Sequence, residues 1–271
     1  MKKTTSRDNP TFRQLRLLAE SSRERRKQNK TMLDGIHLVA AWFERFGPPD
    51  LLVVSEAGER HPEIREFLAG HPQTPPQVFA DALFKEVSPV ATPTGLLALV
   101  TIPPAVHPYG HEGSCVLLEA IQDAGNLGSI LRTSAAAGIT DVYLGAGCAQ
   151  AWSPRVLRAA MGAHFQLRLH EHAALDTVIR SFEGISVSTS LDASESLFDL
   201  DLTGPIAWVF GNEGGGLTAD TARRTKCAAR IPMPGNTESL NVAAAASICL
   251  FEEVRQKTSF RKRGGRAAPP A

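Results

Sequence analysis

Between residues 115 and 257, strand-like segments alternate with helical ones, and this alternation restricts the fold more than any other feature of the chain. The expected strands are short apolar runs, at 116–119, 142–144, 165–169, 185–187, 206–210 and 229–231. Helical patterns separate most of them, and the last helix, from about Leu240 to Lys257, is long. Strands joined through helices pair in parallel and are covered by those helices. We therefore predict an α/β domain with a mostly parallel sheet.

The first hundred residues predict a second, smaller α/β unit. Amphipathic spacing favours helices at 10–19, 35–46, 62–69 and 81–87. Short apolar runs favour strands at 51–55, 78–79 and 96–101. Residues 102–114 contain three prolines and two glycines without a periodic apolar pattern, which is typical of a linker. We expect domains at 1–101 and 115–257, then a basic, disordered tail at 258–271.

Basic residues are concentrated at both ends of the chain, although the formal net charge is only +1. Residues 1–30 carry ten Lys or Arg against three acidic residues, and the segment after Glu253 adds six without any acidic residue. Such runs are often solvated faces or disordered tails. They can also neutralise phosphates without reading sequence. Because two of them flank an enzyme-like core, we favour RNA as the partner.

The cysteines and the hydropathy pattern exclude several other classes of protein. Cys115, Cys148, Cys227 and Cys249 stand far apart, with no C-x-x-C pair and no histidine at zinc-finger spacing. We therefore expect no metal site and interpret the cysteines as buried free thiols. No apolar run reaches the length of about 18 residues that spans a membrane, and the basic N-terminus lacks the apolar region of a signal peptide. The sequence predicts a cytoplasmic protein without membrane contact.

The loop after the first strand of the larger domain could position a cation. Ligands of open parallel sheets bind outside the carboxyl ends of the strands, so residues that follow strands are the informative ones. In residues 122–128, Asn126 is a candidate N-cap of the next helix. Arg132 is expected on the second turn of that helix, from where a guanidinium can hold a phosphate.

Two later loops also follow predicted strands. Residues 211–217 are rich in glycine and would bring backbone groups against a flat ligand, but they lack the G-K-[ST] ending of a P-loop. Residues 232–241 place Ser239 and Asn241 at the entrance of an alanine-rich helix. Each loop alone has a structural explanation, because glycines make turns and Asn or Ser cap helices. Together, the three loops favour a ligand site.

These loops resemble the three signature motifs of the SpoU (TrmH-like) branch of the SPOUT superfamily, in their order and approximate separation. Motif one is matched by 126–133, motif two by 211–217, and motif three by 231–235 with 238–242. Residues 153–163 are similar to the family's helix between motifs one and two. Two positions differ from the usual pattern, Ala124 in place of proline and Ala243 in place of serine.

The resemblance implies both a fold and an assembly. Family members have a trefoil-knotted catalytic domain with a mostly parallel sheet, and they form homodimers with active sites near the subunit interface. The N-terminal unit resembles the ribosomal-protein-like RNA-binding domain that often precedes this catalytic domain, ending at Thr92-Pro-Thr-Gly95. Ribosomal RNA is then a slightly better candidate substrate than tRNA.

The resemblance also implies an activity, the transfer of a methyl group from S-adenosylmethionine to a ribose 2'-hydroxyl of RNA. The implied cofactor site comprises Phe210, Gly211, Asn212, Gly216, Ile231, Met233 and Leu240. The implied catalytic residues are Asn126, Arg132, Glu213, Ser239 and Asn241. Two alternatives remain at this point, an RNA-binding protein that has lost turnover and a SPOUT enzyme that methylates a base nitrogen.

Arg132 corresponds to the family's catalytic arginine, which has been proposed as a general base. A guanidinium is always protonated in proteins and has no acceptor, so we interpret Arg132 as a cation. It would grip the adjacent phosphate and lower the pKa of the ribose hydroxyl, which is otherwise a very weak acid. Asn126, Ser239 and Asn241 would orient the reacting groups. Glu213 either does the same or braces motif one structurally.

Overall fold

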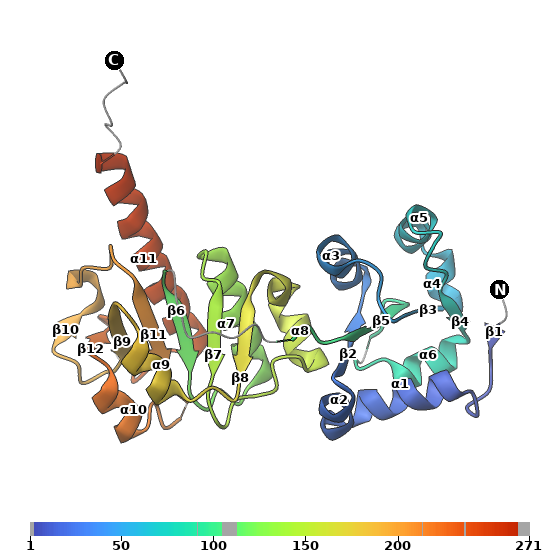
Figure 1. The fold of residues 1–271 in the computed structure, drawn as a ribbon, viewed down its shortest axis with the longest axis horizontal. Coiled ribbons are helices and arrows are strands. Elements are labelled where there is room, and N and C mark those ends of the chain that lie inside the picture. The colour runs from blue at the N-terminus through green and yellow to red at the C-terminus, as the bar shows by residue number, and fades with distance from the viewer. Residues whose placement is uncertain (1–2, 91, 105–112, 213, 236, 265–271) are drawn as a thin grey trace, which may run out of the picture. The chain divides into compact units, whose positions relative to one another are not determined.

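The chain is described by a computed structural model over residues 3–90, 92–104, 113–212, 214–235 and 237–264, without the side chains of 260–264. It divides into two compact units (Figure 1). Unit 1 comprises Met1–Pro104 with Trp152–Phe165, and unit 2 comprises Ala105–Ala151 with Gln166–Ala271. The predicted catalytic domain at 115–257 therefore differs from unit 2, since residues 152–165 pack with unit 1.

Unit 1 is built on a mixed five-stranded sheet in the order β1-β4-β3-β5-β2. Its strands are β1 (Lys3–Thr4), β2 (Lys30–Asp34), β3 (Leu51–Ser55), β4 (Gln77–Phe79) and β5 (Leu96–Thr101). Its helices are α1 (Pro10–Glu20), α2 (Ser22–Gln28), α3 (Ile36–Phe46), α4 (Glu56–Arg60), α5 (Pro62–Gly70) and α6 (Asp81–Val87). β5 runs antiparallel to both β2 and β3, whereas β3, β4 and β1 are parallel. β2 was not predicted.

Helices α1 and α6 cover one face of this sheet. Asn9 begins α1 by accepting from the N–H groups of Thr11 and Phe12 at 2.9 and 3.2 Å. The helical spacing of Phe12, Leu15 and Leu18 then places all three in the core, together with apolar residues of α6 and the sheet. This burial is what fixes the helix on the sheet.

The basic N-terminal segment is not a free leader, because most of it is folded. Lys3, Arg7, Arg13, Arg16 and Lys30 form ion pairs with acidic side chains. Arg25 is buried and donates to the carbonyl oxygens of Leu18 and Ala19, and desolvation lowers its pKa. Exposed ion pairs are weak and can open to phosphates, but fewer unpaired positive charges are present in this segment than the sequence alone indicates.

Residues 152–165 contain α8 (Pro154–Ala160) and the first three residues of a 3-10 turn at Ala163–Gln166. The Thr31 hydroxyl on β2 donates to the carbonyl oxygen of Trp152 at 2.6 Å. Trp42 on α3 lies edge-on to Phe165, with ring centroids 5.6 Å apart. The predicted strand at 165–169 starts later, as β8, because the 3-10 turn occupies its first residues.

Unit 2 contains a seven-stranded sheet in the order β10-β12-β9-β11-β6-β7-β8, in which every pairing is parallel. The strands are β6 (Cys115–Leu118), β7 (Asp141–Leu144), β8 (Arg168–Glu171), β9 (Ile185–Thr189), β10 (Glu195–Ser196), β11 (Ile206–Phe210) and β12 (Cys227–Arg230). The chain adds β7 and β8 on one side of β6 and the later strands on the other. The predicted parallel α/β fold is confirmed, and its switch point lies at β6 and β11.

Helices cover both faces of the parallel sheet. α9 (Leu175–Ser181) packs on Cys115, Leu117, Ala207 and Val209, which alternate along β6 and β11. On the opposite face, α11 (Val242–Gly264) contacts Trp208, whose indole N–H donates to the Glu253 carboxylate. α7 (Ala124–Ala136) packs along α11, and α10 (Ala219–Arg224) contacts α9. α11 continues to Gly264, so the predicted disordered tail is wrong for 258–264, and 265–271 lie outside the described residues.

The four cysteines are free thiols. Cys115 and Cys249 are buried, and burial raises the pKa of the Cys249 thiol to about 12. Cys148 and Cys227 are only half-buried, which differs from the prediction. Within the described ranges, no helix is long and apolar enough to cross a membrane, and no group of His, Cys, Asp and Glu side chains could hold a metal ion.

A charge cluster joins β7 to the edge strand β8. The Asp141 carboxylate accepts from Arg168 at 2.5 and 2.7 Å and contacts the His170 ring nitrogen at 3.1 Å. Burial alone would raise the pKa of Asp141, but hydrogen bonds from Arg168, His170 and Thr140 outweigh it and hold this pKa well below its ordinary value. The cluster stabilises the fold only while Asp141 is ionised.

We expect Asp141→Asn to lower the free energy of unfolding by about 2 kcal/mol, because a buried charge partner is lost while Arg168 stays half exposed. The Asp141 contribution is complete above the pKa of an unfolded aspartate, about 4, and is lost as the pH falls through the folded pKa. When urea unfolding is measured from pH 7 to pH 2.5, the free energy of unfolding should therefore fall less with decreasing pH in the variant than in the unmodified protein. The matched control is Asp176→Asn, which removes an exposed ion pair. Equal effects of the two substitutions would contradict the expectation.

Candidate active site

The parallel sheet of unit 2 has a cavity of about 360 Å³ outside the carboxyl ends of three neighbouring strands. Its lining comes from the residues after β9, from the loop after β11 and from the loop after β12, with the first turn of α11. Ligand pockets of proteins range from about 300 to 1,000 Å³. The cavity therefore lies where a doubly wound sheet binds a ligand and is large enough to hold one.

The loop after β11 is tightly closed. Asn212 and Gly216 exchange backbone hydrogen bonds of 2.9 Å in each direction. The Asn212 side-chain oxygen accepts from the N–H groups of Gly214 and Gly215 at 2.8 and 3.0 Å. A Cβ atom at Gly211 would lie 2.3 Å from the backbone of Gly216, so only glycine permits this approach. The glycines thus create the loop and leave its backbone at the cavity wall.

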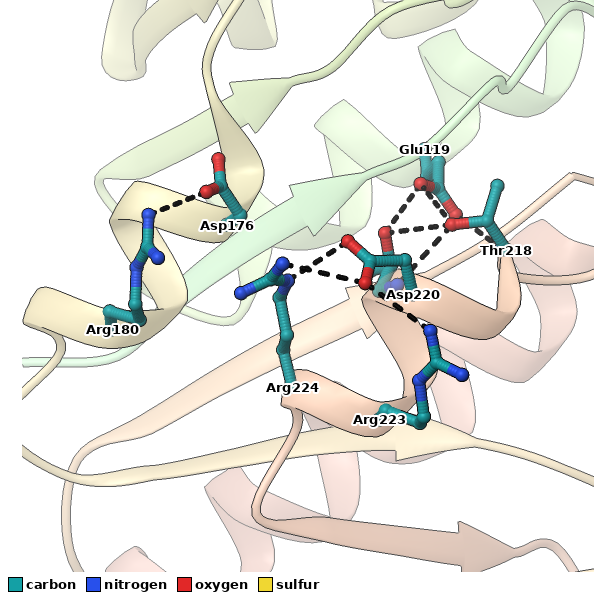
Figure 2. A network of polar contacts seen from close by, with 8 residues as sticks. Glu119, Asp176, Arg180, Thr218, Asp220, Arg223 and Arg224 are labelled. Atoms are coloured by element: carbon teal, nitrogen blue, oxygen red, sulfur yellow. Dashed lines mark hydrogen bonds and ion pairs between the residues drawn. The ribbon is translucent and has the colours of Figure 1, made fainter.

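Two residues after β6 hold both ends of that loop. At its start, the Asn212 amide donates to the carbonyl oxygen of Ala120 at 2.9 Å. At its end, the Glu119 carboxylate accepts from the Thr218 N–H at 2.7 Å and from the hydroxyls of Thr218 and Thr221 at 3.0 and 2.6 Å. Figure 2 shows Glu119 facing Thr218 at the start of α10. We call Glu119 and Ala120 the β6 clamp.

Asn241 joins the loop after β12 to the loop after β6. Its side-chain oxygen caps α11 by accepting from Ala243 and Ala244 at 2.9 and 3.3 Å. Its side-chain nitrogen donates to the Asn126 side-chain oxygen at 2.9 Å. The prediction that Asn126 caps α7 is wrong, because Asp123 is the N-cap and accepts from the Asn126 N–H at 2.7 Å.

Arg132 lies on α7 with an exposed side chain. Because α7 starts at Ala124, Arg132 is on the third turn and not on the predicted second. No ion pair links it to a carboxylate of the described residues. Its guanidinium is not part of the cavity lining. Within one chain, therefore, the Arg132 side chain is accessible to solvent but does not line this cavity.

The cavity brings together most of the residues that the resemblance implies for the cofactor site. Its lining includes Gly211, Asn212, Gly216, Ile231, Met233 and Leu240, and the predicted catalytic residue Ser239. Phe210 is fully buried in β11, and its carbonyl oxygen accepts from the Glu119 N–H. Glu213 lies outside the described residues. The roles of all these residues stay predictions.

Sequence reasoning missed one wall of the cavity, Thr189-Ser190-Leu191, at the carboxyl end of β9. Leu191 is 51% exposed, an unusual position for a large apolar side chain that lines a cavity. The available signal was its place in the segment that follows the strand predicted at 185–187. The β6 clamp was missed too, since a carboxylate that accepts three hydrogen bonds leaves no sequence motif.

Fold and cavity together define the class: an α/β protein with a ligand-sized cavity at the carboxyl ends of β9, β11 and β12 in its parallel sheet. Residues 113–251 match the SpoU rRNA Methylase family. An uncharacterized tRNA/rRNA methyltransferase of Synechocystis, slr1673, is 33% identical over 93% of this chain and 93% of its own. The 23S rRNA (guanosine(2553)-2'-O)-methyltransferase RlmP of Bacillus subtilis is 28% identical over 85% of this chain and 91% of its own.

Solved structures agree with these sequence relatives. The SpoU methyltransferase AviRb from Streptomyces viridochromogenes, in complex with the cofactor AdoMet, has a TM-score of 0.82 and 26% identity. The match covers 93% of this chain and 99% of AviRb. The chain belongs to the SpoU rRNA methylase family. The predicted class of enzyme, an S-adenosylmethionine-dependent RNA 2'-O-methyltransferase, is confirmed, and the two alternatives are set aside.

We expect Glu119→Gln to weaken S-adenosylmethionine binding about tenfold, equivalent to about 1.4 kcal/mol, because a hydrogen bond to a charged acceptor is lost at the end of the loop after β11. Isothermal titration calorimetry measures this change directly. The amide keeps the size of the side chain, so the melting temperature should change little.

The matched control is Asp220→Asn on α10, which removes exposed ion pairs to Arg223 and Arg224 in the same network (Figure 2). Its cofactor affinity should stay within twofold of the unmodified protein. A Glu119→Gln protein with unchanged cofactor affinity would exclude the β6 clamp as a determinant of the cavity.

Proposed function

We propose that this protein methylates a ribose 2'-hydroxyl of ribosomal RNA, with S-adenosylmethionine bound in the strand-end cavity of unit 2. The observation that carries the proposal is the convergence of six predicted cofactor residues on that one cavity. Ribosomal RNA is preferred over tRNA because relatives such as RlmP are named as 23S rRNA enzymes.

The cavity suits this cofactor in shape and chemistry. Backbone groups of the closed loop after β11 are available to the polar edge of an adenine, and Leu191, Leu217 and Leu240 can pack on its faces. Ser239 and Glu238 supply polar groups at the same wall. When bound, the cofactor supplies an activated methyl group on its sulfonium, so alignment is the main task left to the protein.

In the proposed mechanism, Arg132 stays cationic and lowers the pKa of the 2'-hydroxyl. An exposed guanidinium with no ion pair to a carboxylate of the described residues is free to bind the phosphate beside the target ribose. It stabilises the oxyanion as it forms. Asn126 and Asn241 hold the starts of α7 and α11 together, which orients the arginine, and Ser239 and Glu213 are assigned to positioning the ribose and motif one.

The proposal includes a homodimer. Arg132 is accessible but does not line the cavity of its own chain, and a second subunit can complete the site at an interface. The exposed Phe251 on α11 is a suitable apolar contact for that interface. The trefoil knot, the RNA-binding role of unit 1 and a cytoplasmic location belong to the same proposal and follow from the family resemblance.

Replacement of Arg132 by Ala should reduce kcat at least a thousandfold, a loss of about 4 kcal/mol in transition-state stabilisation, while the cofactor dissociation constant stays within threefold. Tritium transfer to total ribosomal RNA measures turnover. The control, Arg223→Ala, removes another exposed arginine of unit 2 and should keep full activity. Full activity of the Arg132→Ala protein would remove Arg132 from the mechanism.

The position of the methyl group provides a separate test. Nuclease digestion of the methylated RNA followed by mass spectrometry should place the label on the ribose and not on the base. A label on a base would contradict the proposed reaction. Sedimentation equilibrium of the full chain should give twice the mass of one 29.1 kDa subunit, and a monomer that is fully active would contradict the shared site.

A further inference from the structure

Unit 1 contains a cavity of about 350 Å³ that shares no residue with the strand-end cavity of unit 2. Four segments of unit 1 form it: the end of β2 with the start of α3, the start of α5, the turn before β5, and α8 with its C-cap. None of the residues that line it is used in the proposed methyl transfer. The cavity therefore needs an explanation of its own.

Apolar side chains form much of the cavity wall. Ile36, Leu38 and Ile64 come from the first turns of α3 and α5, and Met161 comes from the C-cap of α8. Met161 is 56% exposed, the most exposed of the large apolar side chains in the described residues. Methionine adapts to flat or irregular partners and is common at binding surfaces. The wall is thus suited to an apolar, planar group.

Polar groups around the same cavity carry both signs of charge. Arg158 on α8 is exposed and faces a cavity that also contains Asp34 at the end of β2. Burial raises the pKa of Asp34, and the Ser88 hydroxyl holds its carboxylate in place at 2.6 Å. His37 and His61 lie at the rim, where their rings can stack on a planar group.

The starts of α3 and α5 both border the cavity, and neither helix has a side-chain cap. The N-cap residues are Gly35 and His61, and neither makes a capping hydrogen bond. The N–H groups in the first turn of α3, and those that follow Pro62 in α5, are thus left for water or a ligand, and they favour an anion. With Arg158, they form the electropositive part of the cavity.

These features do not fit a simple anion site, because Asp34 and Glu63 would repel an isolated phosphate. They fit a ligand that combines an anion with a planar group bearing hydrogen-bond donors. An unpaired nucleotide has this composition: its phosphate suits Arg158 and the helix starts, its base has flat faces, and its amino or imino groups suit the carboxylates. Proteins read single-stranded RNA through contacts of these kinds.

We propose that the cavity of unit 1 binds one unpaired nucleotide of the RNA substrate, with its phosphate at Arg158 and its base against Met161 and Ile36. The inference rests on the proposed function in that it takes RNA as the substrate. It deepens that function, since it assigns selection of the RNA to a defined subsite remote in sequence from motifs two and three.

The test compares two exposed arginines of α8, Arg158 in the cavity wall and Arg155 outside it. Arg158→Ala should raise KM for the RNA about tenfold, with kcat and the dissociation constant of S-adenosylmethionine unchanged. Arg155→Ala should change KM less than twofold. A second variant, Met161→Lys, places a charge in the wall and should raise KM in the same way. Unchanged KM for both Arg158→Ala and Met161→Lys would overturn the inference.

A binding experiment without catalysis separates this inference from the proposed function. Guanosine and adenosine monophosphates, uridine monophosphate and inorganic phosphate are titrated into the full-length protein, and ring signals of His37 and His61 are followed by NMR. Saturable shifts with a nucleoside monophosphate that are absent with phosphate alone support the subsite. Shifts with phosphate alone, or none with any nucleotide, overturn it. If the unmodified protein does not methylate RNA, that result would refute the proposed function but not the nucleotide subsite of unit 1.

Discussion

The parallel pairing of β6 with β11 is the constraint on which the site depends. It brings residues 119–120 next to the start of the glycine loop, where the β6 clamp holds that loop at both ends. The loop then closes on itself through Asn212 and Gly216. A cavity wall made of backbone needs such support, because glycines have no side chains with which to pack. The shape of the cavity wall thus depends on hydrogen bonds to residues that do not themselves line the cavity.

Strong local signals made much of the fold predictable. Residues 51–55, 81–87, 96–101 and 206–210 adopt the predicted elements without a shift, since the three strands are apolar runs and the helix at 81–87 has amphipathic spacing. Local signals failed where two residues could do the same task. Asp123 and Asn126 are both good helix caps, and the fold uses the first. β2 was missed because Lys30 and Asp34 frame its apolar centre, and its strand character comes from pairing with β5.

The candidate site was predictable in part for a similar reason. Glycine loops and the Ser239–Asn241 entrance are sequence signatures, and the structure gathers them at one sheet edge. Residues 189–191 and Glu119 belong to the site because the sheet places them there, and they form no sequence motif. Their role can therefore be recognised only once the strand order is known. The α8 segment shows the same limit: its sequence resembles the catalytic half, whereas its contacts through Trp152 and Phe165 belong to unit 1. The contacts between two distant segments cannot be predicted from the sequence of either segment alone.

Asn241 uses both halves of one amide, its oxygen for the start of α11 and its nitrogen for Asn126. A side-chain amide offers an acceptor and a donor on two separate atoms at the same end. An aspartate would keep the helix start but place two facing oxygens between the two loops, and a serine is too short to span them. A single side chain therefore couples the start of α11 to the position of the loop after β6, and variation at this position is restricted by geometry as well as by chemistry.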